Sequence, residues 1–597
     1  MTPDREQPAA DHRRRDAAHA VADDYVAALA RTDHEAATVA GVPLEGPLPR
    51  LSPDAYDDRL AAAHAARSAL RGLPPVPAPG AHPDDPENPD DPAGADAALR
   101  LVLAERLDAE IDLAEVGFTQ RLLAPLATPV DAVRATFDHL PRDTDADWET
   151  VLDALGGVGG AYADYLATLT RSARRGHVVA ARQVTGIAAR CRRWVDDGFH
   201  AGVVAGAPDH LRARAEAAAA DAARATSRFA DDVERVLLPV APTTDPVGRE
   251  LYTRTARAFL GTDVDLLETY AWGWSELDRI AGEADALARE LHPDGFDAAA
   301  RMLDEQPERH LAPADIEPWL AERVARVADH VDGRHLDLPA GRHRLPECRM
   351  STAASGVMYY DPPGADLTRP GRVWWTVDPA VGARTWREAT TVHHEGVPGH
   401  HTQILAAMTA PGLHPWQRHL CEVHGHAEGW AHWAEAWAAE IGLLDDPAER
   451  LGMLVGQAWR AARIVIDLGL HLDLPIPPGR GRRGGLAGGA ALGEHARWSV
   501  DLAVDFLRTV TGLGPSMARF EVDRYLGWPA QALAFRVGAR EFESVRVAAR
   551  TAAGPAWDER AFLTALLRLG PMGLGPLRTL GTALAAVPGT RRGGAPA

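Results

Sequence analysis

Apolar residues recur at intervals of three and four positions along most of the chain, with charged and small residues between them. Segments 101–114 and 130–140 show this spacing, and the chain as a whole is rich in Ala, Leu, Arg and Glu. That interval is the period of an amphipathic α-helix, and Ala, Leu, Arg and Glu favour helices. The pattern predicts a mainly α fold, a large helical protein with a cleft.

Three segments interrupt the helical pattern. Residues 74–96 carry many Pro and Asp, and residues 475–490 are rich in Pro, Gly and Arg, so both are predicted to be loops. The tail from Pro588 is predicted to fray. A proline-containing junction near residues 238–247 indicates a boundary between an N-terminal helical region, residues 1–240, and a second region, residues 241–590.

One stretch has the composition of a strand instead. Residues 372–377 read Arg-Val-Trp-Trp-Thr-Val and are bracketed by Gly371 and Pro379. β-Branched and aromatic residues are enriched in strands. We therefore expect a short β-sheet just before the histidine-rich segment described below, where it would offer a substrate backbone an edge to pair with.

Charge and cysteine content exclude several classes of protein. The 597 residues carry a formal net charge of -21, so the surplus of basic groups that binds nucleic acid or an anionic membrane is missing. The three cysteines, Cys191, Cys348 and Cys421, lack a paired spacing, which indicates neither a disulfide framework nor a thiolate metal site. The first thirty residues lack an apolar signal core, and no run of eighteen apolar residues occurs. We expect a cytoplasmic protein without a nucleic-acid or membrane partner.

A histidine-rich segment at residues 393–401 carries the strongest chemical signal. A common zinc motif places two histidines four residues apart on one helical face, with a glutamate beside the first. Here His394 and Glu395 are followed by His400, and six residues turn an ideal helix by about 600°, which would point the two histidines apart. Pro398 and Gly399 can widen the helix locally and bring His400 back.

Two neighbouring histidines are alternatives to His400 and His394. His401 returns to the face of His394, although about 10 Å further along the axis, so we prefer His400. His393 is a candidate if the register shifts by one residue.

A second polar stripe begins about thirty residues later. His424, Glu428, His432 and Glu435 fall at helical spacing, while tryptophans occupy other positions of the same segment. Such a segment is unlike a solvated surface helix. We predict that Glu428 is the third metal ligand, with His424, His432 and Glu435 orienting the ligands or contacting substrate.

These residues predict a hydrolytic zinc centre. Two imidazoles and one carboxylate leave a coordination position for water, whose pKa zinc lowers to about 7. Glu395 can then act as general base and pass the proton to a leaving amine. The oxyanion also needs a donor, and the candidates are Tyr525, Tyr359, Tyr360 and His471.

The motifs resemble those of the bacterial domain-of-unknown-function 885 family, which is grouped with gluzincin zinc peptidases. The likeness rests on the histidine segment, on Glu428-Gly429-Trp430-Ala431 with Glu435, on the segment from Arg463 to His471, and on the segment from Arg524 to Leu533. It covers nearly the whole chain. It implies a mainly helical fold with a gluzincin-like core, a divalent metal and cleavage of short peptides, as in thimet oligopeptidase and angiotensin-converting enzyme. Phe535 stands where that pattern leads us to expect a tyrosine.

Further polar residues lie in the last two of these segments. Arg463, Asp467 and His471 are four residues apart on one predicted helix, a spacing suited to a buried ion pair beside the site. Tyr525 is slightly favoured as the oxyanion donor because Arg524 and Gln531 add polar groups nearby. Alternatively, an arginine of this region could bind a substrate carboxylate. The candidates are Arg524, Arg536 and Arg540.

Three functions are compatible with this inventory. The first is a zinc metallopeptidase with one Zn²⁺ per chain, whose catalytic region lies within residues 241–590 and whose N-terminal half covers the cleft. The second is a metal-dependent amidase acting on a non-peptide or modified natural product. The third is a metal-binding or peptide-binding protein without turnover, which Glu395 disfavours because metal binding alone needs no general base.

Overall fold

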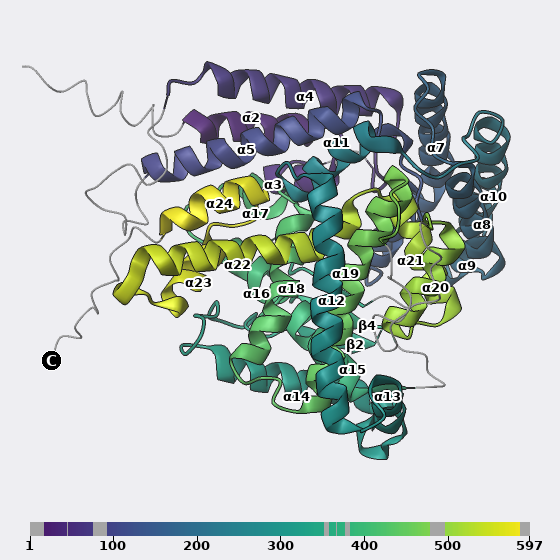
Figure 1. The fold of residues 1–597 in the computed structure, drawn as a ribbon. Helices are drawn as coiled ribbons and strands as arrows, with labels where there is room; N and C mark the ends of the chain where they lie inside the picture. Colours follow the sequence, from purple (N-terminus) through teal and green to yellow (C-terminus); the bar gives the residue numbers. More distant parts are fainter. Residues whose placement is uncertain are drawn as a thin grey trace, which may run out of the picture.

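The computed structural model describes residues 17–43, 46–75, 92–350, 358–365, 367–376, 382–477 and 496–584. Helices dominate throughout, and the predicted mainly α fold is confirmed. Figure 1 shows helices α2, α4 and α5 across one end of the molecule, with α7, α8 and α10 beside them. Between and below them lie the helices of the second half of the chain.

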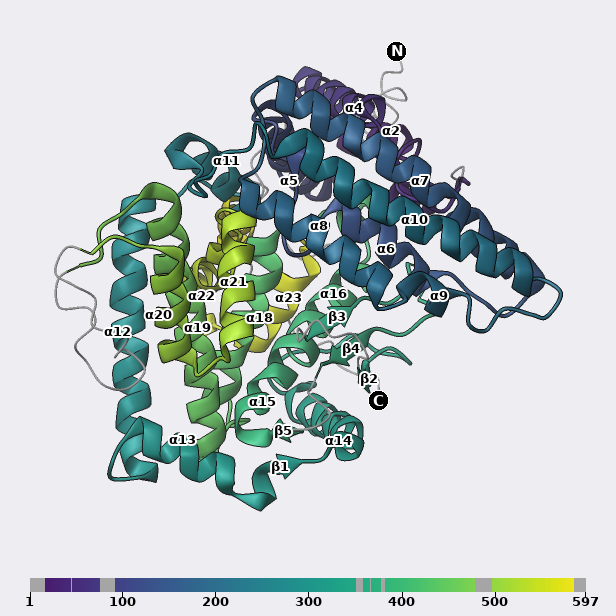
Figure 2. The same cartoon turned by 90° about the vertical axis from the view of Figure 1, so that its right-hand side faces the viewer.

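The N-terminal helices divide between two hydrophobic cores. Helices α2, α4 and α5 pack against one another and share the larger core with residues 252–580. Helices α7, α8 and α10 pack together around a smaller core within residues 51–237 (Figure 2). The bounds of this half are α2 Ala17–Leu29, α3 His34–Ala40, α4 Pro53–Gly72, α5 Pro92–Glu115, η1 Thr119–Arg121, α6 Pro129–His139, α7 Asp145–Arg174, α8 Ala181–Asp196, α9 Phe199–Val203 and α10 Arg212–Leu237.

Long helices of the second half build the larger core. Helix α19 packs against α12 on one side and α15 on another, and α18 packs against α22. The bounds up to α18 are α11 Gly248–Leu260, α12 Leu266–Leu291, α13 Phe296–Glu305, η2 Pro307–Arg309, α14 Pro313–Val331, α15 Thr385–Thr391, η3 Val392–Gly396, α16 His400–Thr409, α17 Pro415–His419 and α18 His424–Glu440. The remaining bounds are α19 Pro447–Leu472, α20 Val500–Thr511, α21 Pro515–Gly527, η4 Gln531–Leu533, α22 Ala534–Ala553, η5 Gly554–Ala556, α23 Glu559–Arg568 and α24 Leu574–Ala583.

The predicted strand forms the centre of a small sheet. Strand β4, Arg372–Trp375, lies between β2, Glu347–Met350, and β3, Tyr359–Asp361. It pairs in parallel with β2, and antiparallel with β3, where Tyr359 is opposite Trp374. The last residue of the predicted strand, Val377, lies outside the described residues. A further pair joins β1, His310–Leu311, to β5, Ala383–Arg384.

The predicted loop at residues 74–96 is too long at its carboxyl end, because α5 already begins at Pro92. Proline fits the first turn of a helix, where its missing N–H has no partner in any case. Asp96 is buried and accepts a hydrogen bond from the amide of Ala18 at 2.8 Å, so it binds the first turn of α2. Residues 76–91, most of the predicted loop at 475–490 and the tail from Pro588 lie outside the described residues.

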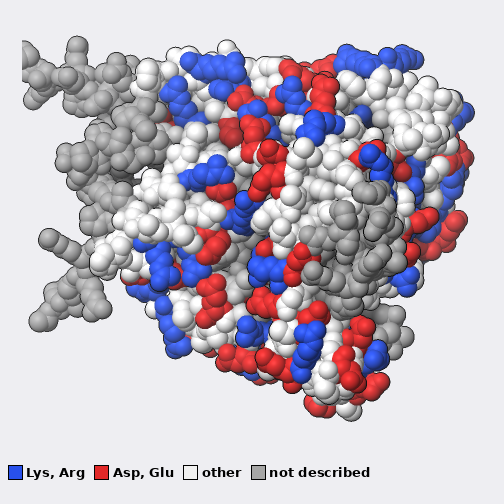
Figure 3. Space-filling model, viewed as in Figure 1, with Lys and Arg blue, Asp and Glu red and all other residues white. Residues whose placement is uncertain are grey.

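No helix in the described ranges is long and apolar enough to cross a bilayer. On the face drawn in Figure 3, acidic and basic side chains are interspersed. The division of the chain into two regions at residue 240 stays a prediction. The last buried residue of the smaller core is Leu237, and the last partly buried residue packed against that core is Ala241.

Candidate metal centre

The two candidate histidines stand on two separate helical segments. The chain widens into a π turn over Val392–Gly396, leaves the helix at Val397, and starts a new helix, α16, at His400. Pro398, which follows a cis peptide bond, cannot continue the hydrogen-bond ladder. A Cβ on Gly399 would lie 1.9 Å from the carbonyl oxygen of His394, so only glycine fits. The expected widening is present, but an interruption of the helix completes the geometry.

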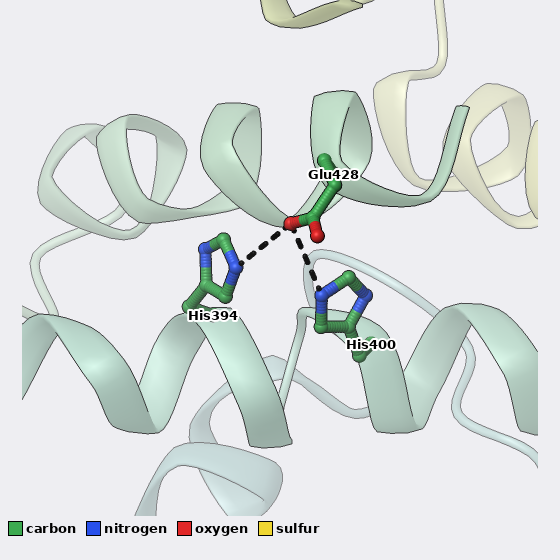
Figure 4. A group of neighbouring side chains, drawn as sticks. All are labelled: His394, His400 and Glu428. Carbon is green, nitrogen blue, oxygen red and sulfur yellow. Dashed lines mark ion pairs between the residues drawn. The ribbon is translucent and has the colours of Figure 1, made fainter. Parts of the chain in front are cut away.

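This interruption brings His394 and His400 together (Figure 4). Their ring centroids are 4.9 Å apart, and Glu428 of α18 reaches between them. Its Oε2 lies 3.3 Å from Nε2 of His394 and 3.6 Å from Nε2 of His400. One donor atom from each of the three residues falls within 4.8 Å of the others. Two imidazoles and one carboxylate are a ligand set suited to catalytic zinc.

Charges around the group favour a cation. Burial alone would lower the pKa of His394, but its contacts with Glu428 and Glu435 raise that pKa to about 10. Burial would raise the pKa of Glu428, but His394 and His400 hold it well below its usual range. Positive charge is thus favoured at the place where the donor set would hold a divalent metal.

Glu435 orients His394. Its Oε1 lies 2.7 Å from Nδ1 of His394, and its Oε2 accepts a hydrogen bond from the Thr390 hydroxyl at 2.7 Å. With Nδ1 donating to Glu435, the other ring nitrogen of His394, Nε2, is directed at Glu428. His432 supports Glu435 in turn, with its Nδ1 at 3.4 Å from Oε1. Carboxylates in this position fix the tautomer and raise the basicity of a metal-bound histidine.

Glu395 lies beside the group, with Oε1 at 4.0 Å from Nε2 of His394. It is buried, and burial raises the pKa of its carboxyl despite the opposing effect of His394 and His400. Its side chain lines the same cavity as the three candidate ligands. Glu395 therefore stands where a general base for a metal-bound water would be needed.

The cavity that contains these residues has a volume of about 970 Å³. Residues from both halves of the chain form its walls. Glu35 and Leu126 belong to the N-terminal half, and Tyr359 and Tyr360 belong to β3 in the second half. The Tyr359 ring stacks on Trp374, and it is 44% exposed. That the N-terminal half covers the cleft stays a prediction.

The alternative histidines do not join the group of three. His401 points to other partners: Nδ1 is 2.8 Å from the Tyr360 hydroxyl and Nε2 is 3.2 Å from the Arg344 carbonyl oxygen. His393 is buried and is not among the residues that line the cavity. His424 does line it, and its ring packs edge-on against Phe259 and Trp528.

Tyr525 and His471 are not among the residues that line the cavity, and their polar atoms have other partners than a reacting oxyanion. The Tyr525 hydroxyl donates to Glu521 Oε2 at 2.8 Å and accepts from Arg463 Nε at 3.1 Å, so it has no proton to offer an oxyanion. His471 accepts at Nδ1 from the amide of Val247 and donates from Nε2 to the carbonyl oxygen of Tyr525. Burial lowers the pKa of His471 to about 4, which keeps the ring neutral. Both side chains are satisfied parts of the packed interior.

The expected buried contacts along α19 form in part. Oδ1 of Asp467 lies 3.5 Å from Nε2 of His471, whereas Arg463 pairs with Glu521 of α21 at 2.8 Å. Asp467 accepts hydrogen bonds from the Tyr252 hydroxyl at 2.6 Å and from the amide of Ala530 at 2.9 Å. Glu521 gave no signal in the sequence, because its partner is 58 residues away along the chain.

Of the remaining predicted residues, Arg536 and Arg540 are not among those that line the cavity, and they pair with Glu276 and Glu268. Arg524, Gln531 and Phe535 do lie at the cavity wall. Arg524 and Gln531 line the cavity and are joined by a 2.8 Å hydrogen bond from Arg524 to the Gln531 side-chain oxygen. The ring of Phe535 stacks on His394, with centroids 6.3 Å apart. The position where a tyrosine was expected is therefore directly beside the three candidate ligands, called the metal group below.

Arg460 is a cavity residue that the sequence analysis missed. It precedes Arg463 by three residues on α19, so the two share one side of the helix. That repeated arginine spacing was the available signal.

The sequence matches, over residues 35–580, the family described as "Bacterial protein of unknown function (DUF885)". The chain belongs to this family. Two solved structures share the DUF885 chain's fold: a "putative lipoprotein" from Colwellia psychrerythraea and a "putative lipoprotein of unknown function" from Shewanella oneidensis. The first is 18% identical with a TM-score of 0.78, covering 96% of this chain and 99% of its own. The second is 15% identical with a TM-score of 0.62, covering 89% and 93%. None of the curated proteins matches this DUF885 sequence.

Proposed function

We propose that this DUF885 protein is a gluzincin-type zinc hydrolase that cleaves peptide bonds in short peptides. The observation that carries the proposal is the convergence of His394, His400 and Glu428 within 4.8 Å, with Glu395 on the wall of the same cavity. A structural polar cluster would need no additional carboxyl group at this point. Glu395 adds the proton acceptor that hydrolysis requires.

Each residue has a defined role in the proposed reaction. His394, His400 and Glu428 hold the metal, and Glu435 fixes the ring of His394. Zinc bound there would lower the pKa of a water molecule to about 7 and polarise the substrate carbonyl group. Glu395 accepts the proton of the attacking water and delivers it to the amine nitrogen as the C–N bond breaks.

The cavity supports short peptides as substrates. A volume of about 970 Å³ lies at the upper end of the range for small-molecule sites, and residues of the N-terminal half supply part of its wall. Strand β3 lies at an edge of its three-stranded sheet and contributes Tyr359 and Tyr360 to the lining. An extended substrate can pair with such an edge.

Replacement of Glu395 by Gln tests the mechanism. We expect about one zinc per chain in the wild-type protein and chelator-sensitive hydrolysis of a peptide library followed by mass spectrometry. The Glu395→Gln protein should keep its zinc and lose turnover by at least about 10²-fold, because the general base is gone. Glu388→Gln, which removes another carboxyl group of the cavity, should retain turnover.

Other outcomes of that experiment separate the remaining functions. Unchanged turnover in Glu395→Gln contradicts the mechanism. Stoichiometric zinc without peptide cleavage favours the amidase, which a library of non-peptide amides would detect, or a binding protein without turnover. The cytoplasmic location stays a prediction, and cell fractionation checks it.

A further inference from the structure

Arg460 is a cavity-lining arginine without an acidic partner. Within the described ranges, no carboxylate oxygen lies within 4.0 Å of its guanidinium, and its one hydrogen bond runs from Nη1 to the Gly456 carbonyl oxygen at 3.4 Å. Neighbouring cavity arginines are paired: Arg463 with Glu521, and Arg387 with Asp304. A guanidinium carries five N–H donors, and leaving most of them unused in a partly buried place costs free energy.

The neighbours of Arg460 hold the guanidinium without using its donors. Its central carbon lies 5.1 Å from the centre of the Trp459 ring and 5.8 Å from that of Phe535. Stacking of this kind fixes the plane of the group and leaves its N–H edges free. Phe535 also stacks on His394, so the guanidinium is one aromatic ring away from the metal group.

A second measure also places Arg460 beside the metal group. A Cβ built on Gly456 would lie 3.4 Å from Nη1 of Arg460 and 3.7 Å from Oε2 of Glu435. Glu435 in turn contacts His394 at 2.7 Å. The head group of Arg460 therefore stands next to Glu435 without pairing with it, and the absence of a side chain at Gly456 leaves room for it.

We propose that Arg460 binds a carboxylate of the substrate, so that the site selects peptides with a free carboxyl terminus close to the cleaved bond. This inference rests on the proposed function and names its substrate class. The planar fork of arginine matches a carboxylate with two parallel hydrogen bonds. An extended peptide advances about 3.3–3.6 Å per residue, so a terminus held beside Glu435 belongs to a residue near the scissile bond.

The competing explanation is electrostatic. Arg460 would then serve only as a counter-charge to the nearby carboxylates of Glu435 and Glu428. In that case its removal would alter zinc affinity and leave substrate selection unchanged. A comparison of acid and amide ligands separates the two explanations.

The test measures binding to zinc-loaded Glu395→Gln protein, so that it does not depend on turnover. The probes are a tripeptide library with free carboxyl termini and the same library amidated, with the bound fraction measured by ultrafiltration and mass spectrometry. We expect the acids to bind at least about 10-fold more tightly than the amides, as a charge-assisted bidentate contact predicts. Adding Arg460→Gln should remove this preference by weakening the acids alone, and Arg460→Lys should restore part of it.

Arg418→Gln is the matched control, because Arg418 also lines the cavity and bonds the Ala410 carbonyl oxygen. It should leave the preference for acids intact. Equal binding of acids and amides by the protein with Arg460, or an unchanged preference in folded Arg460→Gln, overturns the inference. Absence of zinc, or turnover that survives Glu395→Gln, counts against the proposed function instead, so the two failures are distinguishable.

Discussion

Glu428 and Glu435 both contact His394, but we assign them different roles: Glu428 is a metal ligand, and Glu435 orients the ligand His394. Substituting each glutamate in turn distinguishes the two roles. In Glu435→Gln the amide oxygen can still accept from Nδ1 of His394, and the amide N–H₂ can donate to the Thr390 hydroxyl, which rotates to accept. The two 2.7 Å contacts are therefore kept, and only the negative charge is lost. Loss of such a partner lowers metal affinity about 10- to 100-fold, or about 1.4–2.8 kcal/mol.

In Glu428→Ala, by contrast, one of three proposed ligands disappears, and zinc affinity should fall by more than about 100-fold. The assay is competition for zinc between each apo-protein and a chelator of known affinity, with thermal melting to show that each variant is folded. Glu388→Gln is the control and should match the wild type in zinc affinity, because Glu388 lines the cavity without a hydrogen bond or ion pair to a described residue. A larger loss in Glu435→Gln than in Glu428→Ala would refute the assignment.

Two further predictions concern stability. Gly429→Ala should lower the free energy of unfolding by about 1–3 kcal/mol, because its Cβ would lie 2.6 Å from Cα of Gly538 on α22. Gly282→Ala is the control, because Gly282 is exposed on α12 with open space around it, and it should raise the free energy of unfolding by up to about 1 kcal/mol. Thermal melts measure both variants, and equal effects of Gly429→Ala and Gly282→Ala would contradict the packing argument. Burial raises the pKa of Glu388 to about 7 from 4.5, so ionised Glu388 destabilises the fold as pH rises. Glu388→Gln should therefore be about 1–3 kcal/mol more stable than wild type above pH 7 and equal to it below pH 4.5, and a pH-independent difference in Tm would refute this.

Local sequence patterns predicted the helices, the central strand and the group of His394, His400 and Glu428. Each depends on short-range signals: helical spacing, β-branched and aromatic composition, and the combination of Pro398 and Gly399. His400 could be preferred over His401 because proline and glycine change the chain direction in a known way. The form of that change, a π turn followed by a new helix, depends on packing against α18 and could not be predicted.

Residues whose roles depend on distant partners were assigned less well. Tyr525 and His471 were expected at the reaction centre, but Glu521 and the amide of Val247 satisfy them within the interior. Arg460 was missed for the converse reason, since its importance lies in lacking a partner. The pairing of buried polar groups is settled by tertiary contacts, which a helical period does not encode.

The shared core of α2, α4, α5 and residues 252–580 has a consequence for how the protein is made. Leu103 of α5 and Leu580 of α24 belong to one core although 477 residues separate them in the sequence. A nascent chain can complete the smaller core once α10 has left the ribosome, but the larger core stays unfinished until α24 is synthesised. During that interval the apolar faces of the first helices are exposed, and chaperones that hold them would govern the yield of folded protein.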